Sequence, residues 1–230
     1  MNDAVQVTGM QVQAKSNTTY LLISNANTGD EAPANAAAIQ AENGGAGFTS
    51  VALTGSSALY PVAPASALTV GSSGSHTNYA AGAAAGQPTY WYTMIGTDPT
   101  STGYVGKEHT EQDVTGSSAS YVLKKTFYFT IAAGANGATD LVVDSVTITN
   151  TAAAVRCLVV GPNGNSALYT ESSDTDSIVL VPTLNNTTVY AVTVYVYYDG
   201  NYSSIYTNNI PSIDAGTVAL TFKVTAGAGE

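Results

Sequence analysis

The stretch Tyr121–Ile131, YVLKKTFYFTI, has the alternating pattern of a β-strand that is buried on one face. Apart from two adjacent lysines it consists of aromatic, β-branched and aliphatic residues. Counting by twos places Lys124 on a mixed face with Val122, Thr126, Tyr128 and Thr130. The other face carries Lys125 with the more apolar set Leu123, Phe127, Phe129 and Ile131. We therefore expect this second face to lie against a hydrophobic core.

Lys124 is then an ordinary outward-facing lysine, whereas Lys125 stands at the start of a core-facing row. Three placements of Lys125 are open. It lies at the rim of the fold with its ammonium group in water, it acts as an inward-pointing charge that protects an exposed strand edge, or it forms an ion pair with a carboxylate.

Short runs rich in Val, Ile, Thr, Tyr and Phe recur along the rest of the chain, bounded by Gly, Asn, Asp, Ser or Pro. They cover residues 4–14, 19–25, 48–54, 58–63, 89–95, 140–150, 155–161, 177–182, 189–200 and 216–226. About ten evenly spaced strands predict an all-β fold. We expect a two-sheet antiparallel sandwich of jelly-roll or Greek-key type, with long loops and at most one or two short helices.

The organisation along the chain indicates one β-sandwich domain over residues 1–230. Residues 69–88 are small and polar without a period, and residues 96–120 hold much charge, so both are expected to be long surface loops. The Ala-rich segment Glu31–Asn43, with Pro33 near its start, is either one short helix or a loop. The alternation slips by one residue at Gly9, which indicates a bulge or hinge there.

Charge and cysteine content narrow the classes of function. The net charge is −10, so binding to nucleic acid is not expected. No run approaches eighteen apolar residues, and no membrane span is predicted. Cys157, the one cysteine, is expected to be a small buried hydrophobe in a strand, because the alternative role of nucleophile needs a nearby histidine.

Catalytic and metal motifs are missing from the sequence. It has no HExxH, no GxSxG and no zinc-binding set of Cys and His, so no enzyme activity and no cofactor are expected. Asp174 and Asp176 alternate as calcium ligands do, but the glycine and distal glutamate of an EF-hand are absent. They are either a calcium site or solvated loop acids.

Tyrosines and sequons suggest two kinds of surface site. In the run 189–200, Tyr195 and Tyr197 fall on the face opposite the valines, which predicts a tyrosine-rich surface suited to carbohydrate stacking or subunit contact, or a plain outer sheet face. The glycosylation pattern Asn-x-Ser/Thr occurs at Asn17, Asn185, Asn186 and Asn201.

Four segments in this order resemble a known group: VTGMQVQAKSNTTYLLISN, YVLKKTFYFTI, LVVDSVTITN with VRCLVV, and VTVYVYYDGNYSSIYTNNI with AGTVALTFKVTA. The chain is similar to the camelysin/TasA-like exported fibre subunits of Gram-positive, mostly clostridial, bacteria. The resemblance implies a jelly-roll sandwich, export through a cleaved signal peptide, and assembly into extracellular or biofilm-matrix filaments. Matching metal ligands for the peptidase label of camelysin-like proteins are absent.

The resemblance also implies assembly of identical subunits by donation of an N-terminal strand. Residues 1–8, with Ala4, Val5 and Val7, are the expected donor, set off by Gly9; alternatively, Val5 and Val7 pair within the subunit's own sheet. In a filament the partner of Lys125 would belong to the neighbouring subunit. The competing hypothesis is a secreted cell-surface module that binds carbohydrate or adheres through the tyrosine-rich face.

Overall fold

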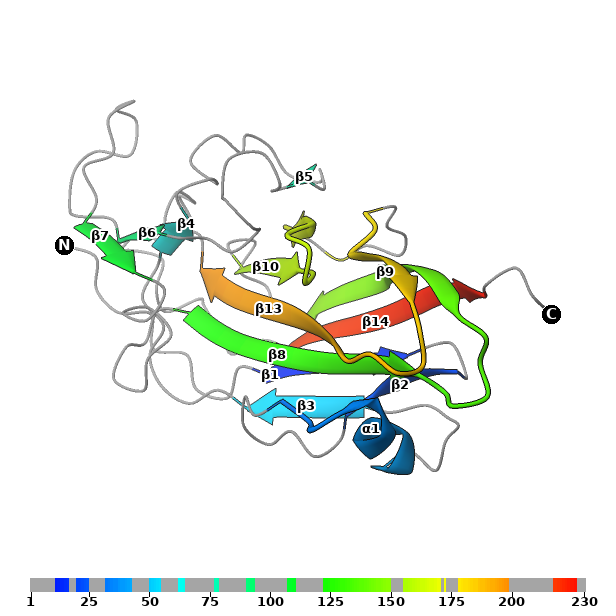
Figure 1. Cartoon of the computed structure of the whole chain (residues 1–230). Helices are drawn as coiled ribbons and strands as arrows, with labels where there is room; N and C mark the ends of the chain where they lie inside the picture. Colours follow the sequence, from blue (N-terminus) through cyan, green and yellow to red (C-terminus); the bar gives the residue numbers. More distant parts are fainter. Residues whose placement is uncertain are drawn as a thin grey trace.

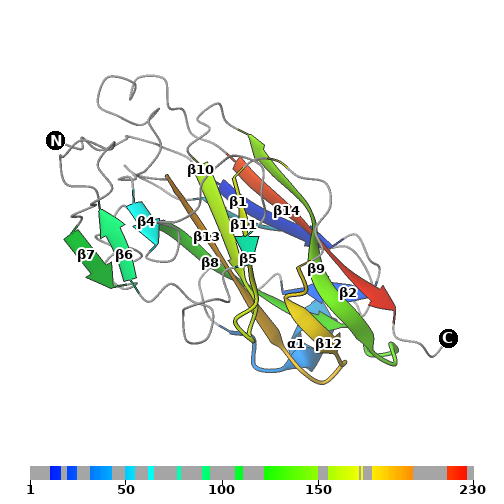
Figure 2. The same ribbon diagram turned by 90° about the horizontal axis from the view of Figure 1, so that it is seen from above.

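The computed structural model describes residues 11–16, 20–24, 32–42, 50–54, 62–64, 77–78, 90–93, 107–110, 122–149, 155–170, 172, 178–198 and 217–226. Strands dominate these residues, and two larger sheets pack face to face (Figures 1 and 2). The all-β, two-sheet sandwich expected from the sequence is confirmed. Jelly-roll topology and the single domain over 1–230 stay predictions.

The first sheet, called the β14 sheet here, has the strand order β12-β9-β14-β1-β3. Its members are β12 (Val181–Leu184), β9 (Ala138–Thr149), β14 (Thr217–Ala226), β1 (Gln11–Ser16) and β3 (Ser50–Thr54). Adjacent strands run antiparallel except β1 and β14, which are parallel with Gln11 opposite Thr217. The expectation of a purely antiparallel sandwich is therefore wrong at this pair, because the chain crosses the whole domain before β14 inserts beside β1.

The second sheet, called the β13 sheet, has the order β2-β8-β13-β10-β11-β5 and is antiparallel. Its members are β2 (Leu21–Ile23), β8 (Val122–Ile131), β13 (Tyr190–Tyr198), β10 (Val155–Val160), β11 (Ser166–Tyr169) and β5 (Thr77–Asn78). The opening stretch of the sequence is thus β8, and it pairs with β13 along most of its length.

A third, smaller sheet joins β4 (Val62–Pro64), β6 (Tyr90–Thr93) and β7 (Lys107–Thr110). Two short strands lie within the ranges expected to be long surface loops. The range 69–88 contains β5, which pairs with β11, and the range 96–120 contains β7, which pairs with β6. These strands are too short, at two and four residues, to leave a period in the sequence.

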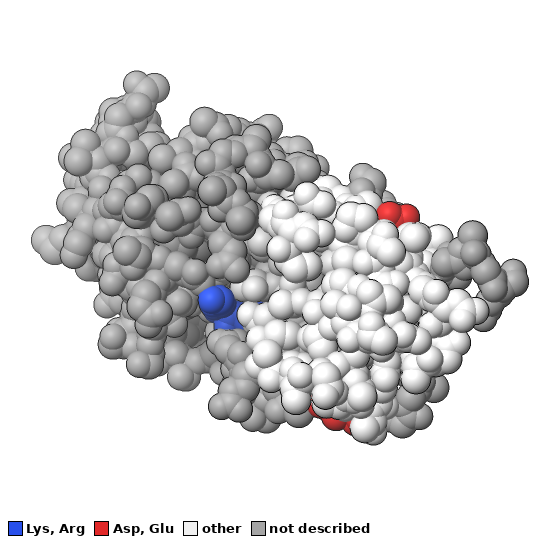
Figure 3. Space-filling view, viewed as in Figure 1, with Lys and Arg blue, Asp and Glu red and all other residues white. Residues whose placement is uncertain are grey.

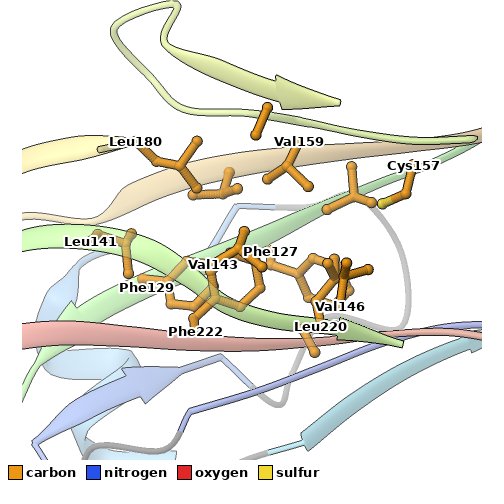
Figure 4. Close-up of a cluster of buried hydrophobic side chains, with 14 of the residues drawn as sticks. Phe127, Phe129, Leu141, Val143, Val146, Cys157, Val159, Leu180, Leu220 and Phe222 are labelled. Carbon is orange, nitrogen blue, oxygen red and sulfur yellow. The ribbon is translucent and has the colours of Figure 1, made fainter. Parts of the chain in front are cut away.

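The hydrophobic core lies between the β14 sheet and the β13 sheet (Figure 4). Phe127 and Phe129 point into it from β8, as the period-two reading predicted, and meet Val143 of β9 and Phe222 of β14. The rings of Phe129 and Phe222 are 4.8 Å apart at 60°, a tilted pair worth about 0.5–1.5 kcal/mol beyond the area it buries. One buried cluster draws residues from β1, β2 and each strand from β8 to β14.

Two irregularities bend β9 where it pairs with β14. Asp140 has φ 56°, and Asp140 and Leu141 stand opposite Val224 alone, which is the arrangement of a β-bulge. A second register shift falls at Asp144, whose carboxylate pairs with Lys223 at 2.6 Å. Since both side chains are partly exposed, this ion pair contributes at most about 1 kcal/mol.

Of the two alternatives for residues 31–43, a short helix or a loop, the structure shows the helix, α1 (Ala36–Glu42). Asn35 caps it, because the Asn35 Oδ1 accepts a hydrogen bond of 3.0 Å from the Ala38 amide. Ile39 is buried, and Gln40 Nε2 donates to the carbonyls of Ile131 and Asn186, each at 2.8 Å. The helix therefore closes one end of the sandwich, called the α1 end, by tying β8 to the β12–β13 connection.

Candidate assembly interface

The edges of the two larger sheets are the first places to look for an assembly interface, because an edge strand presents backbone donors and acceptors without partners. Among the described strands, β12 and β3 border the β14 sheet, and β2 and β5 border the β13 sheet.

Three of these four edges are poor templates for an added strand. β2 and β5 have three and two residues. β12 has four residues and contains Pro182, which lacks a backbone N–H and so removes one donor from the strand. Short strands and edge prolines are two ways in which proteins block edge-to-edge pairing.

The remaining edge, β3, differs from the others. Its five residues, SVALT, include neither a proline nor a charge, and β-branched residues favour an extended backbone. β1 pairs with one side of β3, from Gln11 opposite Thr54 to Lys15 opposite Ser50. Within the residues that the structure describes, no strand pairs with the other side. β3 is thus the longest of the described edges and the best template for strand addition.

The parallel pairing of β1 with β14 fixes where the chain enters and leaves the sheet. Gln11 lies opposite Thr217, at the first residue of β14, while β14 runs on to Ala226 beside Ala138. β1 therefore begins at one end of the β14 sheet, and β14 ends at the other, the α1 end (Figure 2). Residues 1–8, with Ala4, Val5 and Val7, lie outside the described residues, so the donor-strand assignment stays a prediction.

The structure rules out one of the three placements that the sequence leaves open for Lys125. It lies on β8 opposite Val194 of β13, in the core-facing row of Phe127, and only 1% of its surface is exposed. A position at the rim with its ammonium group in water is therefore wrong. Lys125 has an interaction partner in the structure; whether that partner is a carboxylate stays a prediction.

Lys124, by contrast, faces the other side of β8, as predicted. Its ammonium nitrogen lies 6.0 Å from the centre of the Tyr195 ring, directly across the strand pair. A cation held over a tyrosine face at this distance gains about 0.5–1 kcal/mol where it is solvated. Of the two adjacent lysines, Lys124 thus stabilises the side of the β13 sheet that faces away from the core.

The tyrosine-rich surface is not found. Tyr195 and Tyr197 do lie on the side of β13 opposite the core-facing valines, but their exposed fractions are 0% and 1%. β13 is flanked by β8 and β10, and β4 lies against it. Both faces of β13 are therefore covered, and these two rings are not available as a carbohydrate platform on the surface of the subunit.

The remaining predicted sites divide into those confirmed and those not described. Cys157 is fully buried in β10, where burial raises the pKa of its thiol, so it is a core hydrophobe as expected. Asp174, Asp176, Asn17 and Asn201 lie outside the described residues. In the described part of the chain, no group of three or more His, Cys, Asp and Glu could hold a metal ion.

The adjacent sequons at Asn185 and Asn186 lie in the connection from β12 to β13, at the α1 end, and their side chains differ. The Nδ2 group of Asn186 donates to the carbonyls of Ala133 and Ala135, at 2.9 and 3.2 Å. Asn185 is exposed, and its Oδ1 accepts hydrogen bonds from the amide and the hydroxyl of Thr187, at 3.0 and 2.9 Å.

The surface of the described residues carries few charged groups. Seen as in Figure 1, it is almost entirely uncharged, with a small basic area and isolated acidic spots (Figure 3). Such a surface resembles the centre of a protein interface, where charged residues are depleted.

Sequence reasoning missed the position of β3 at the edge of its sheet among the described strands, because period-two patterning identifies strands without giving their order in a sheet. The proline in β12 was a usable signal that this strand lies at an edge. Comparison of the chain with protein-family models, with curated proteins and with solved structures finds no match. None of the helical residues described forms a segment long and apolar enough to cross a membrane.

Proposed function

We propose that the chain is a structural subunit of an extracellular filament or matrix fibre, in which identical copies join head to tail by strand addition. The observation that carries the proposal is the parallel β1–β14 pair next to the open edge of β3. Residues 1–8 would serve as donor from the start of β1, whereas the side of β3 that faces away from β1 would serve as acceptor, so donor and acceptor are different surfaces of the subunit.

The lengths of donor and acceptor are compatible. An extended segment of eight residues spans about 26 Å, at about 3.3 Å per residue. The five residues of β3 need about 17 Å of a partner strand. Residues 1–8 of one copy are therefore long enough to pair with the whole β3 edge of the next. Because donor and acceptor are different surfaces, such a contact repeats without closing and produces an open polymer.

The charges of the chain affect the association of identical copies in two opposite ways. Only 10% of the residues are charged, although the net charge of −10 disfavours close approach of subunits in dilute salt. Strand addition relies on backbone hydrogen bonds. Their donors and acceptors are uncharged, so they add no repulsion between identical copies. Filament assembly should therefore become faster as salt screens the repulsion between subunits. The proposal includes a location outside the cell.

The first experiment is negative-stain microscopy of the purified chain, with and without residues 2–8. We expect fibres from the full chain and monomers from the truncated one. A labelled peptide of residues 1–8 should then bind the truncated chain, and a peptide with Val5→Asp and Val7→Asp should not. Fibres of unchanged length after truncation would remove the donor segment, and a full chain that stays monomeric at all salt concentrations would refute the filament.

A second experiment addresses the acceptor edge. Successive residues of a strand point their N–H groups to opposite sides, so of Ala52→Pro and Leu53→Pro one removes a donor toward β1 and the other a donor on the open edge. The variant that keeps its thermal stability should still donate its own residues 1–8 but should terminate growth when it is mixed with the unmodified chain. Normal elongation by both variants would exclude β3 as the acceptor.

A further inference from the structure

The connection between β12 and β13 contains two overlapping glycosylation sequons, Asn185-Asn186-Thr187 and Asn186-Thr187-Thr188. Both asparagines satisfy the glycosylation pattern, since each has a threonine two residues later. A glycan is bulky and hydrophilic, and a folded chain tolerates it only where the asparagine amide nitrogen faces solvent. The contacts of the two side chains therefore decide which one can carry it.

Asn186 is committed to the fold. Both hydrogens of its Nδ2 group are used, because Ala133 and Ala135 each accept one through a carbonyl oxygen. Its own backbone carbonyl accepts the Gln40 side chain at 2.8 Å. An N-linked sugar replaces one Nδ2 hydrogen. It would therefore occupy the space in which Ala133 and Ala135 of the β8–β9 turn lie. Glycosylation at Asn186 would thus separate α1 and the β8–β9 turn from β13.

Asn185, by contrast, is fixed to the fold through its backbone amide, and its side chain is exposed. Its backbone amide donates to the Tyr190 hydroxyl at 3.0 Å. The Oδ1 atom accepts both the amide and the hydroxyl of Thr187, which fixes the rotation of the carboxamide. No residue that the structure describes accepts a hydrogen bond from Asn185 Nδ2, and the residue is exposed. A sugar at this nitrogen displaces only water.

We propose that Asn185 is an acceptor for N-linked glycan and that Asn186 is not. The donor is a lipid-linked diphosphate oligosaccharide, and an oligosaccharyl transferase catalyses the reaction. Asn185 Nδ2 forms a bond to the anomeric carbon, the bond from that carbon to the diphosphate oxygen breaks, and Nδ2 loses one proton. The proposal rests on the export of the chain that the proposed function includes, and not on its polymerisation.

The overlap of the sequons provides matched variants that change neither asparagine. Thr187→Ala destroys the sequon of Asn185 and keeps that of Asn186, whereas Thr188→Ala does the reverse. The chain and both variants are secreted from a host whose export pathway attaches N-glycans. Enzymatic release of the glycan in ¹⁸O water then converts the carrier asparagine to labelled aspartate, which peptide mass spectrometry locates.

We expect labelled aspartate at position 185 in the unmodified chain and in Thr188→Ala, and at neither position in Thr187→Ala. Label at position 186 in any of the three, or no label at 185 in the unmodified chain, would overturn the proposal. Microscopy of the same material separates the two ideas. Fibres without a glycan refute the acceptor site alone, and a glycan at Asn185 on a permanent monomer refutes the filament alone.

Discussion

Replacement of Gly161 by alanine tests whether the β10–β11 hairpin is locked against the opposite sheet. Gly161 is buried between β10 and β11, and a Cβ atom added to it would overlap the backbone carbonyl of Leu180. The same atom would lie 3.0 Å from the Leu180 carbonyl carbon and 3.1 Å from its Cα. Backbone atoms cannot rotate away, so either the hairpin or the segment that leads into β12 has to move.

The size of the effect follows from what this movement disturbs. Overpacking a well-filled site costs about 1–3 kcal/mol. The shift also lengthens one of two bonds that hold the segment, Leu180 N to Leu141 O or Asn165 Nδ2 to Val179 O, each 2.8 Å, for about 0.5–1.5 kcal/mol more. Alanine returns about 0.4–1 kcal/mol by restricting the unfolded chain. The net loss is about 2 kcal/mol, which in a chain of this size lowers Tm by roughly 4–8 °C.

Urea unfolding followed by circular dichroism measures this loss, and Gly134→Ala is its matched control. Gly134 lies in the turn between β8 and β9, where an added Cβ meets nothing within 4 Å. Gly134→Ala should therefore unfold at the same or a slightly higher urea concentration than the unmodified chain. Equal midpoints for the two variants would refute the contact between Gly161 and Leu180.

Further predictions concern four residues, of which three are buried and one has a strained backbone. The Ser166 hydroxyl is buried without a hydrogen-bond partner among the described residues, so Ser166→Ala should stabilise the fold by about 1 kcal/mol. Thr130→Val loses a 2.9 Å hydrogen bond to the Thr188 carbonyl oxygen, so it should destabilise the fold by about 1–2 kcal/mol in the same assay. A stabilising Thr130→Val would contradict this. Burial raises the pKa of the Cys157 thiol above its ordinary 9.0, so the folded state keeps a proton that the unfolded state loses, and stability should fall as pH rises above about 9. Urea midpoints measured from pH 8 to 10.5 should show a steeper fall for the unmodified chain than for Cys157→Ala, and identical slopes would exclude the thiol as the cause. Asp140 has a positive φ, so Asp140→Gly should be neutral or stabilising and Asp140→Val should cost about 1–2 kcal/mol; equal stability of the two would show that the bulge is not strained.

Sequence alone gave the strands of the sandwich core reliably, because alternation is a local consequence of burying one face. Phe127 and Phe129 on the inner side of β8 and Cys157 in the core were predictable in this way, whereas the segment that contains α1 was left open between a helix and a loop. Each depends on residues close together in the chain.

What sequence reasoning missed depends on which strands become neighbours. Tyr195 and Tyr197 alternate as surface residues do, but β4, far away in sequence, lies against their strand and they are buried. The parallel pairing of β1 with β14, the edge position of β3 among the described strands and the amide contacts of Asn186 likewise depend on distant parts of the chain. A one-dimensional pattern carries no information on which distant segments of the chain become partners.

The position of β14 in the middle of its sheet has a consequence for how the chain folds. Thr217–Ala226 is the last strand described, yet it lies between β9 and β1. Until these residues have been synthesised, β1 and β9 both have an open edge and cannot form a continuous sheet. Closure of loops of this length makes folding slow and leaves partly folded chains prone to aggregate. A chain released without β14 should therefore be degraded or insoluble, and folding should be completed only after residues 217–226 have been synthesised.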